Sequence, residues 1–133
     1  MSLSKFADKN QDGLYVIFRI LVGLLFLQHG VQKLFGSFGG QAADITSLMG
    51  AAGLIEFFAG LFIAFGLFTR LAAAVSAIEM IVAYAMVHMG QAVIPLVNQG
   101  ELALLYFAAF LAILAFGARR LSLDNMFFHR ETF

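Results

Sequence analysis

Four long apolar stretches, separated by short polar or glycine-containing segments, form the main pattern along this chain. They cover residues 14–35, 48–68, 71–88 and 101–117, and a helix needs roughly 20 largely apolar residues to cross a bilayer. We therefore predict an all-α fold, an integral membrane antiparallel four-helix bundle, with residues 1–133 as a single transmembrane domain and 118–133 as its tail. The segment 66–70 is so short that the second and third helices must form a hairpin.

Composition supports a membrane protein and excludes several kinds of chemistry. The 133 residues are 62% hydrophobic and 12% charged, with a mean hydropathy of +0.91, which is far more apolar than a soluble domain of this size. The net charge is zero, so no basic face indicates binding to nucleic acid. The chain has no cysteine, which excludes disulfides, thiol redox chemistry and Cys-ligated metals. Any redox role must use a bound cofactor or a partner.

Basic residues predict the orientation in the membrane. The loops at 36–47 and 89–100 contain no Lys or Arg. The N-terminus, the second connection and the tail contain six: Lys5, Lys9, Arg70, Arg119, Arg120 and Arg130. Because basic loops stay in the cytoplasm, we expect both termini to be cytoplasmic. The polar, mixed-charge segment 1–13 does not resemble a cleaved signal peptide.

Ionisable residues inside the apolar stretches are the best indication of a site. Glu56 and Glu79 each interrupt a stretch, and His29 and Lys33 lie at the end of the first one. A charge at mid-bilayer costs about 2.5–3.5 kcal/mol on insertion scales, so such groups usually face a bundle interior. Small residues share a helical face with Glu56, Glu79 and Glu101, which predicts that all three carboxylates point inwards. These small residues are Gly53, Gly60 and Ala64, then Ala72, Ser76 and Ala83, then Ala108, Ala112 and Ala115.

The helical rise predicts which of these groups meet. His29, Lys33, Glu56 and Glu101 fall in the outer half of the bundle, whereas Arg19 and Glu79 share a depth nearer the cytoplasm. One interpretation is structural, with Lys33–Glu56 and Arg19–Glu79 as buried ion pairs. The other is a site that binds a quinone, because a histidine and a desolvated glutamate can exchange protons. In that case His29 and Glu56 are catalytic, Lys33 is a hydrogen-bond donor or counter-charge, Glu101 is an acceptor at the rim of the site, and phenylalanines supply an apolar slot.

Haem and metal sites are less favoured by the spacing. His88 lies nine residues after Glu79, on the opposite side of a straight helix. If Glu79 faces inwards, His88 faces away unless the helix kinks or ends earlier, which disfavours haem ligated by His29 and His88. His88 is then a candidate for a ligand site at an interface between copies in a homo-oligomer. The Glu-x-x-His spacing of di-metal bundles does not occur, so we predict no metal site.

Four short motifs, taken in order, resemble the DoxX family of small four-helix membrane proteins. The motifs are residues 29–36, which include His29, Gln32 and Lys33; Glu56 with Gly60 and 66–70; 101–106; and 120–124. At 117–119 the chain has Gly-Ala-Arg where many members have a Gly-Pro-Gly-like turn. The resemblance implies a multi-pass protein of a prokaryotic cytoplasmic membrane. Some relatives are described as subunits of thiosulfate:quinone oxidoreductase or of a terminal quinol oxidase, and others associate with superoxide dismutase and a sulfurtransferase in oxidant defence.

Two functional hypotheses follow. The first is a membrane subunit of a redox system that binds a quinone between helices, with Gln32, Glu79 and Arg19 as further binding or supporting residues. The alternative is a non-catalytic anchor in the bilayer that recruits soluble redox proteins on its cytoplasmic side. Its contact surface would consist of Arg70, Arg119, Arg120 and Asp124, although these residues also suit a purely orienting role.

Overall fold

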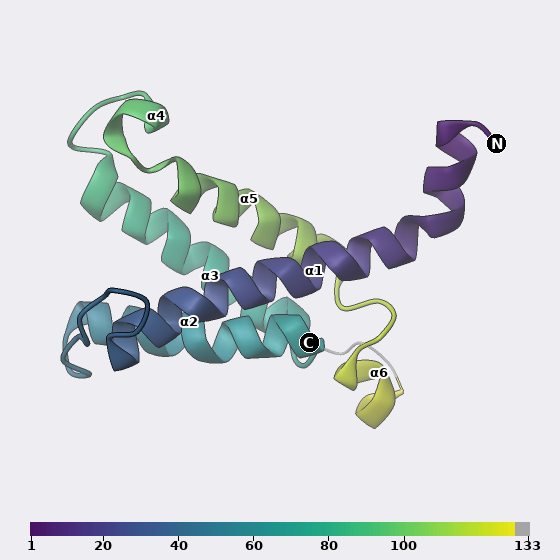
Figure 1. The fold of residues 1–133 in the computed structure, drawn as a ribbon, viewed down its shortest axis with the longest axis horizontal. Coiled ribbons are helices and arrows are strands. Elements are labelled where there is room, and N and C mark those ends of the chain that lie inside the picture. The colour runs from purple at the N-terminus through teal and green to yellow at the C-terminus, as the bar shows by residue number, and fades with distance from the viewer. Residues whose placement is uncertain (130–133) are drawn as a thin grey trace.

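The computed structural model describes residues 1–129, which are helical with no strand among them (Figure 1). The elements are α1 (Leu3–Phe35), α2 (Leu48–Phe65), α3 (Thr69–Ala83), its π-helical continuation η1 (Tyr84–His88), α4 (Pro95–Asn98), α5 (Glu101–Phe116) and α6 (Leu123–Phe128). Three of the helices (α1, α2, and α3 with η1) are long and apolar enough to cross a membrane, and α5 is a shorter apolar helix. The all-helical prediction is confirmed; Arg130 lies outside the described residues.

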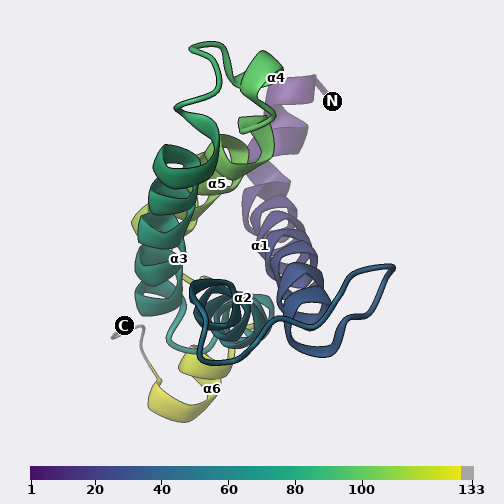
Figure 2. The same cartoon turned by 90° about the vertical axis from the view of Figure 1, so that its left-hand side faces the viewer.

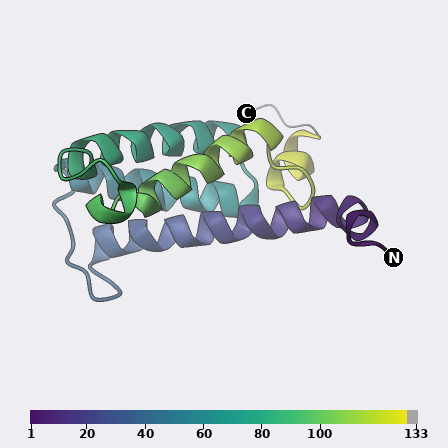
Figure 3. The ribbon, with the colours of Figure 1, turned by 90° about the horizontal axis from the view of Figure 1, so that it is seen from above.

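The long helices are arranged as two pairs. Viewed end-on, α1, α2, α3 and α5 follow one another around the bundle (Figure 2). Helix α1 packs mainly on α2 and α5 packs mainly on α3, whereas the backbones of α1 and α5 approach each other at few positions and meet through aromatic side chains. The N-terminus and α6 lie at one end of the bundle, which we call the tail end (Figure 3). Helix α4 and the two longer loops lie at the opposite end, which we call the loop end.

Glycines allow α1 and α2 to approach at backbone distance. A Cβ atom on Gly60 would lie 2.6 Å from the backbone N of Leu27 and 2.8 Å from the carbonyl O of Gly23. Small residues permit this close packing of helices in a membrane. On α2, the predicted inward face of Gly53, Glu56 and Gly60 is confirmed, because all three are buried.

A buried arginine holds the tail end together. Arg19 is fully buried, and its guanidinium donates to the carbonyls of Ala118, Arg120 (3.1 Å) and Leu121 (2.7 Å). These carbonyls lie between α5 and α6, outside any helix, so their oxygens need donors from elsewhere. Arginine carries five N–H groups and suits this role.

The expected Arg19–Glu79 ion pair is therefore wrong. Arg19 is level with the end of α2, where it also donates to the carbonyl O of Ala64 at 3.4 Å. Glu79 lies ten residues into α3, about 15 Å along the helix. The prediction failed because helical rise gives the depth of residues within helices only. It could not show that the non-helical segment after α5 folds back to the level of Arg19.

Residues expected to form a partner surface at the tail end are mostly used within the fold. Asp124 is 2% exposed and accepts hydrogen bonds from the backbone N–H groups of Phe68 (2.8 Å) and Thr69 (3.3 Å), so it caps α3. Arg70 donates to two carbonyls at the end of α5. Arg119 pairs with Asp12 at 2.9 Å, while the more exposed Arg120 approaches the same carboxylate at 3.3 Å. The surface role expected for Asp124 is wrong, because the side chain is buried.

The close contact of α1 and α2 yields a stability prediction. Gly60→Ala should lower the free energy of unfolding by about 1–3 kcal/mol, because its methyl group would meet backbone atoms that cannot rotate away. The measurement is thermal unfolding of the purified protein in mild detergent, followed by circular dichroism.

Gly13→Ala is the matched control, because a Cβ there meets nothing within 4 Å. It should leave stability unchanged or raise it slightly, since alanine favours a helix over glycine. Equal effects of the two substitutions would contradict backbone-to-backbone packing at Gly60.

Candidate functional site: a polar pocket between the helix pairs

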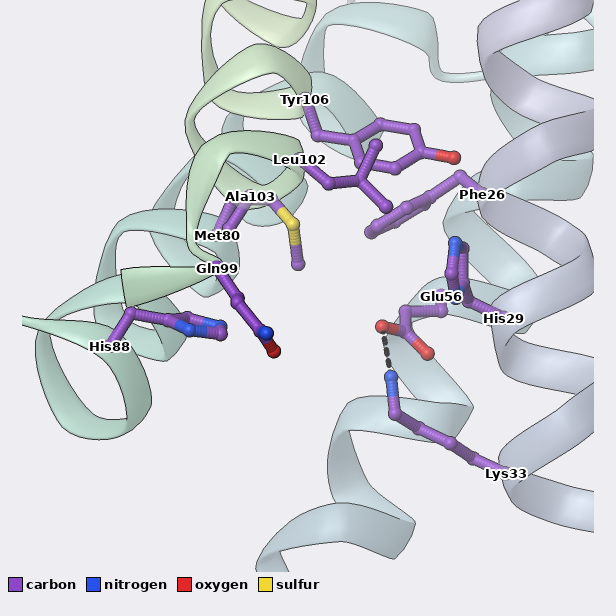
Figure 4. A pocket seen from close by; sticks show the side chains of 10 residues that line it. All are labelled: Phe26, His29, Lys33, Glu56, Met80, His88, Gln99, Leu102, Ala103 and Tyr106. Atoms are coloured by element: carbon purple, nitrogen blue, oxygen red, sulfur yellow. Dashed lines mark hydrogen bonds and ion pairs between the residues drawn. The ribbon is translucent and has the colours of Figure 1, made fainter. Parts of the chain in front are cut away.

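A cavity of about 220 Å³ lies between the two helix pairs toward the loop end (Figure 4). Its lining combines apolar and polar side chains from both pairs. The α1/α2 wall consists of Phe26, His29, Lys33 and Glu56, and the α3/α5 wall consists of Met80, His88, Gln99, Leu102, Ala103 and Tyr106.

The α1/α2 wall carries an ion pair. Lys33 Nζ lies 2.5 Å from Glu56 Oε1, as the structural interpretation predicted. Glu56 is 3% exposed, and its other oxygen, Oε2, has no hydrogen-bond partner among the described residues. His29 lies one turn before Lys33 on the same face of α1 and meets Tyr106 edge to face at 5.9 Å. The predicted meeting of His29, Lys33 and Glu56 is confirmed.

The π-helical segment η1 brings His88 into the pocket. The N–H of Met89 donates to the carbonyl O of Tyr84 at 3.0 Å, which is the i→i+5 bond of a π-helix. This wider turn rotates the residues after Ala83 relative to a straight α-helix. The expectation that His88 faces away from the interior is therefore wrong: its ring lines the cavity together with Met80.

The loop after η1 folds into a cap held by Asn98. This side chain is fully buried; it donates to the carbonyl O of Ala92 (3.0 Å) and to the Tyr84 hydroxyl (3.1 Å), and accepts from Gly100 N (2.8 Å). The cap directs Gln99 to the cavity. Sequence reasoning missed Asn98 and Gln99, whose only signal was their polarity next to an apolar run.

Helix α5 turns a different face inward from the one expected. Tyr106, Phe110 and Ile113 are its buried residues, whereas Glu101 and Ala108 are exposed. Phe26 packs on Tyr106 and Phe110, with ring centroids 5.4 and 4.7 Å apart. The inward placement of Glu101 is wrong because burying large aromatic rings removes more apolar surface than burying the alanine face.

Two other candidates lie outside the lining of the cavity. Gln32 donates weakly to the carbonyl O of Phe38 at 3.4 Å, which places it against the first loop. Glu79 is inward, as predicted, and lies within electrostatic range of Glu56 and Lys33. Both of its carboxylate oxygens are buried without a hydrogen-bond partner among the described residues.

The size and side chains of the cavity limit what it can hold. Ligand pockets for drug-sized molecules measure roughly 300–1,000 Å³, so about 220 Å³ suits a single substituted ring rather than a macrocycle. No group of three or more His, Cys, Asp or Glu within residues 1–129 is arranged to hold a metal ion. The polar groups suit hydrogen bonding and proton exchange with a small ring.

Comparison with known proteins identifies the family. Residues 14–89 match the DoxX family model. The chain belongs to the DoxX family. It is also similar to an uncharacterized protein of Haemophilus influenzae, with 35% identity over 130 residues that cover 92% of this chain and 97% of the relative. No solved structure matches the chain. The resemblance drawn from the sequence motifs is confirmed.

The ion pair in this DoxX protein yields the second prediction. Lys33→Met should destabilise the protein by about 3 kcal/mol, because it leaves the Glu56 carboxylate buried without its counter-charge. The double variant Lys33→Met, Glu56→Gln should recover part of this loss in thermal unfolding. If the loss in the double variant equalled the sum of the losses in Lys33→Met and Glu56→Gln alone, the two residues would not be energetically coupled.

Proposed function

We propose that this DoxX protein is the membrane subunit of a redox system and binds a quinone head group in the pocket between its helix pairs. The observation that carries the proposal is the pocket itself, in which hydrogen-bonding groups project from opposite walls between apolar and aromatic side chains. A pocket of this composition is the usual form of a small-molecule site. When bound, a quinone supplies coupled exchange of electrons and protons.

The side chains present fit such a head group. A flat ring can lie between Phe26, Met80 and Tyr106, and its oxygen can reach the ion pair on the α1/α2 wall. Glu56 Oε2 is buried and unpaired among the described residues, and a buried polar atom without a partner is costly. A ligand hydroxyl would supply the missing hydrogen bond.

Each polar residue of the α1/α2 wall then has a defined task. Lys33 Nζ holds Glu56 Oε1 and donates to a ligand oxygen. Glu56 Oε2 accepts the proton of a bound hydroxyl. His29 lies one helical turn before Lys33 on α1 and exchanges this proton with Glu56. Glu79 is buried within electrostatic range of Glu56 and Lys33, and it has a supporting role beside this ion pair.

The arrangement of helices provides a direction for an apolar ligand tail. The backbones of α1 and α5 approach each other at few positions, and the rings of Phe26, His29 and Tyr106 fill the space between them. A tail would therefore leave the pocket on the loop-end side of these rings, toward the lipid. This route suits a lipid-soluble ligand, because its tail never has to cross an aqueous surface.

We further propose that α1, α2, α3 with η1, and α5 all span a prokaryotic cytoplasmic membrane, with both termini in the cytoplasm. The tail end carries most of the basic residues, as such an orientation requires: Lys5, Lys9, Arg70, Arg119 and Arg120. The 16 residues of α5 extend about 24 Å, against roughly 30 Å of hydrocarbon. Local thinning of the bilayer and the apolar loop that contains α4 would accommodate this difference.

The alternative, an anchor that recruits soluble redox proteins, has less support. Of its four expected contact residues, Asp124 is buried, and Arg70 and Arg119 bind other parts of the same chain. The side chain of Arg120 is 81% exposed, which leaves a smaller surface for a soluble partner than the sequence indicated. A homo-oligomer would also have to use a surface other than His88, which faces the pocket.

The role of Glu56 can be tested with a conservative substitution. Glu56→Gln should leave the protein folded and weaken the binding of a short-chain hydroquinone, kept reduced, at least roughly tenfold, because a neutral amide replaces the charged acceptor of the ligand hydroxyl. Binding is measured by calorimetric titration in mild detergent. A reduced-minus-oxidised spectrum of protein purified with its native lipids should show a near-ultraviolet quinone change without visible haem bands.

Glu101→Gln serves as the control, because it makes the same change on an exposed carboxylate outside the pocket. It should not alter hydroquinone affinity. Unchanged affinity in a correctly folded Glu56→Gln variant would eliminate the proposed role of Glu56, and sharp visible bands would favour haem ligation by His29 and His88.

The orientation can be tested by labelling single cysteines, because the natural chain has none. In intact cells, a membrane-impermeant maleimide should label Gln41→Cys, in the first loop, without permeabilisation. Ser4→Cys, at the tail end, should react only after permeabilisation. The reverse pattern would place the termini outside.

A further inference from the structure

The α3/α5 wall of the pocket carries polar groups that have no role in the proposed function so far. His88 at the end of η1 and Gln99 just before α5 both point into the space opposite Lys33 and Glu56 (Figure 4). The cavity therefore has hydrogen-bonding groups at two opposite sides, separated by apolar side chains.

The hydrogen bond of His88 determines which of its nitrogens faces a ligand. Nδ1 lies 2.9 Å from the carbonyl O of Asn98, and a carbonyl can only accept, so Nδ1 carries the hydrogen. In the neutral ring Nε2 is then a hydrogen-bond acceptor. The ring also stacks on Tyr84 at 6.3 Å, which restrains its orientation. His88 thus presents a fixed acceptor, the natural partner of a hydroxyl.

Gln99 is held beside His88 by an enforced backbone conformation. Its φ of +60° is rare for a residue other than glycine, and such conformations persist only where the surroundings impose them. The buried Asn98 imposes this one through its bond to the N–H of Gly100 at 2.8 Å. The Gln99 amide has no hydrogen bond of its own to another described side chain, and it can either donate or accept.

We propose that this wall recognises a second oxygen, so that the pocket selects a ring with an oxygen at each end, preferentially the hydroquinone form. One hydroxyl binds Glu56 and Lys33, and the opposite hydroxyl donates to His88 Nε2 and contacts the Gln99 amide. This inference rests on the proposed function and adds the identity of the groups that determine specificity.

The test compares two ligands that differ by one hydroxyl: tetramethylhydroquinone, kept reduced under anaerobic conditions, and tetramethylphenol with the same methyl pattern. Wild-type protein should bind the hydroquinone roughly tenfold more tightly, the worth of one good hydrogen bond. In His88→Phe, which keeps an aromatic ring and removes both nitrogens, the ratio of the two dissociation constants should fall to about three, because the Gln99 contact remains.

Gln99→Gly is the second variant, and glycine suits the positive φ at this position, so folding is preserved. It should lower the same ratio by roughly threefold, and it decides the question if His88→Phe fails to fold. His129→Asn, which removes an exposed imidazole from the end of α6, should leave the ratio unchanged.

Three outcomes separate the two proposals. A wild-type preference for the hydroquinone that both pocket variants retain would overturn the inference and leave the quinone pocket intact. Equal weakening of both ligands in His88→Phe would make His88 a structural residue, which also overturns it. If neither ligand binds wild-type protein, the proposed function fails and the inference fails with it.

Discussion

Polar groups within a bilayer must find their hydrogen-bond partners inside the protein, because lipid offers none. Arg19 meets this requirement for the tail end of the bundle. It binds three carbonyls of the segment that follows α5, and that segment in turn places Asp124 over the start of α3. One buried side chain on α1 therefore ties α5, α6 and α3 together, and the relative positions of the two helix pairs depend on it.

The pocket exists because the two helix pairs are packed by different means. Glycines bring α1 and α2 together at backbone distance, whereas on α5 the aromatic rings of Tyr106 and Phe110 keep the opposing pair further away. The space left between the pairs lies at the loop end, where the Lys33–Glu56 pair lies. Close packing of α1 on α2, together with these aromatic rings, thus leaves a cavity between the pairs.

The π-helical segment η1 determines the chemistry of the far wall. A π-turn interrupts the regular phase of a helix and is often found at functional sites. Here it turns His88 inward, and the cap held by Asn98 both orients the imidazole and places Gln99 beside it. The segment between η1 and α5 therefore forms part of the pocket wall as well as connecting the two helices.

The sequence by itself determined the helical membrane class, the family, the α2–α3 hairpin and the meeting of His29, Lys33 and Glu56. Those features depend on hydrophobic length, local motifs and helical periodicity, which are properties of short segments. Only the tertiary structure decided the partners of Arg19, the face of α5 that is buried, and the inward turn of His88. Each of these depends on a non-helical backbone or on competition between helix faces, and neither leaves a periodic signal in the sequence.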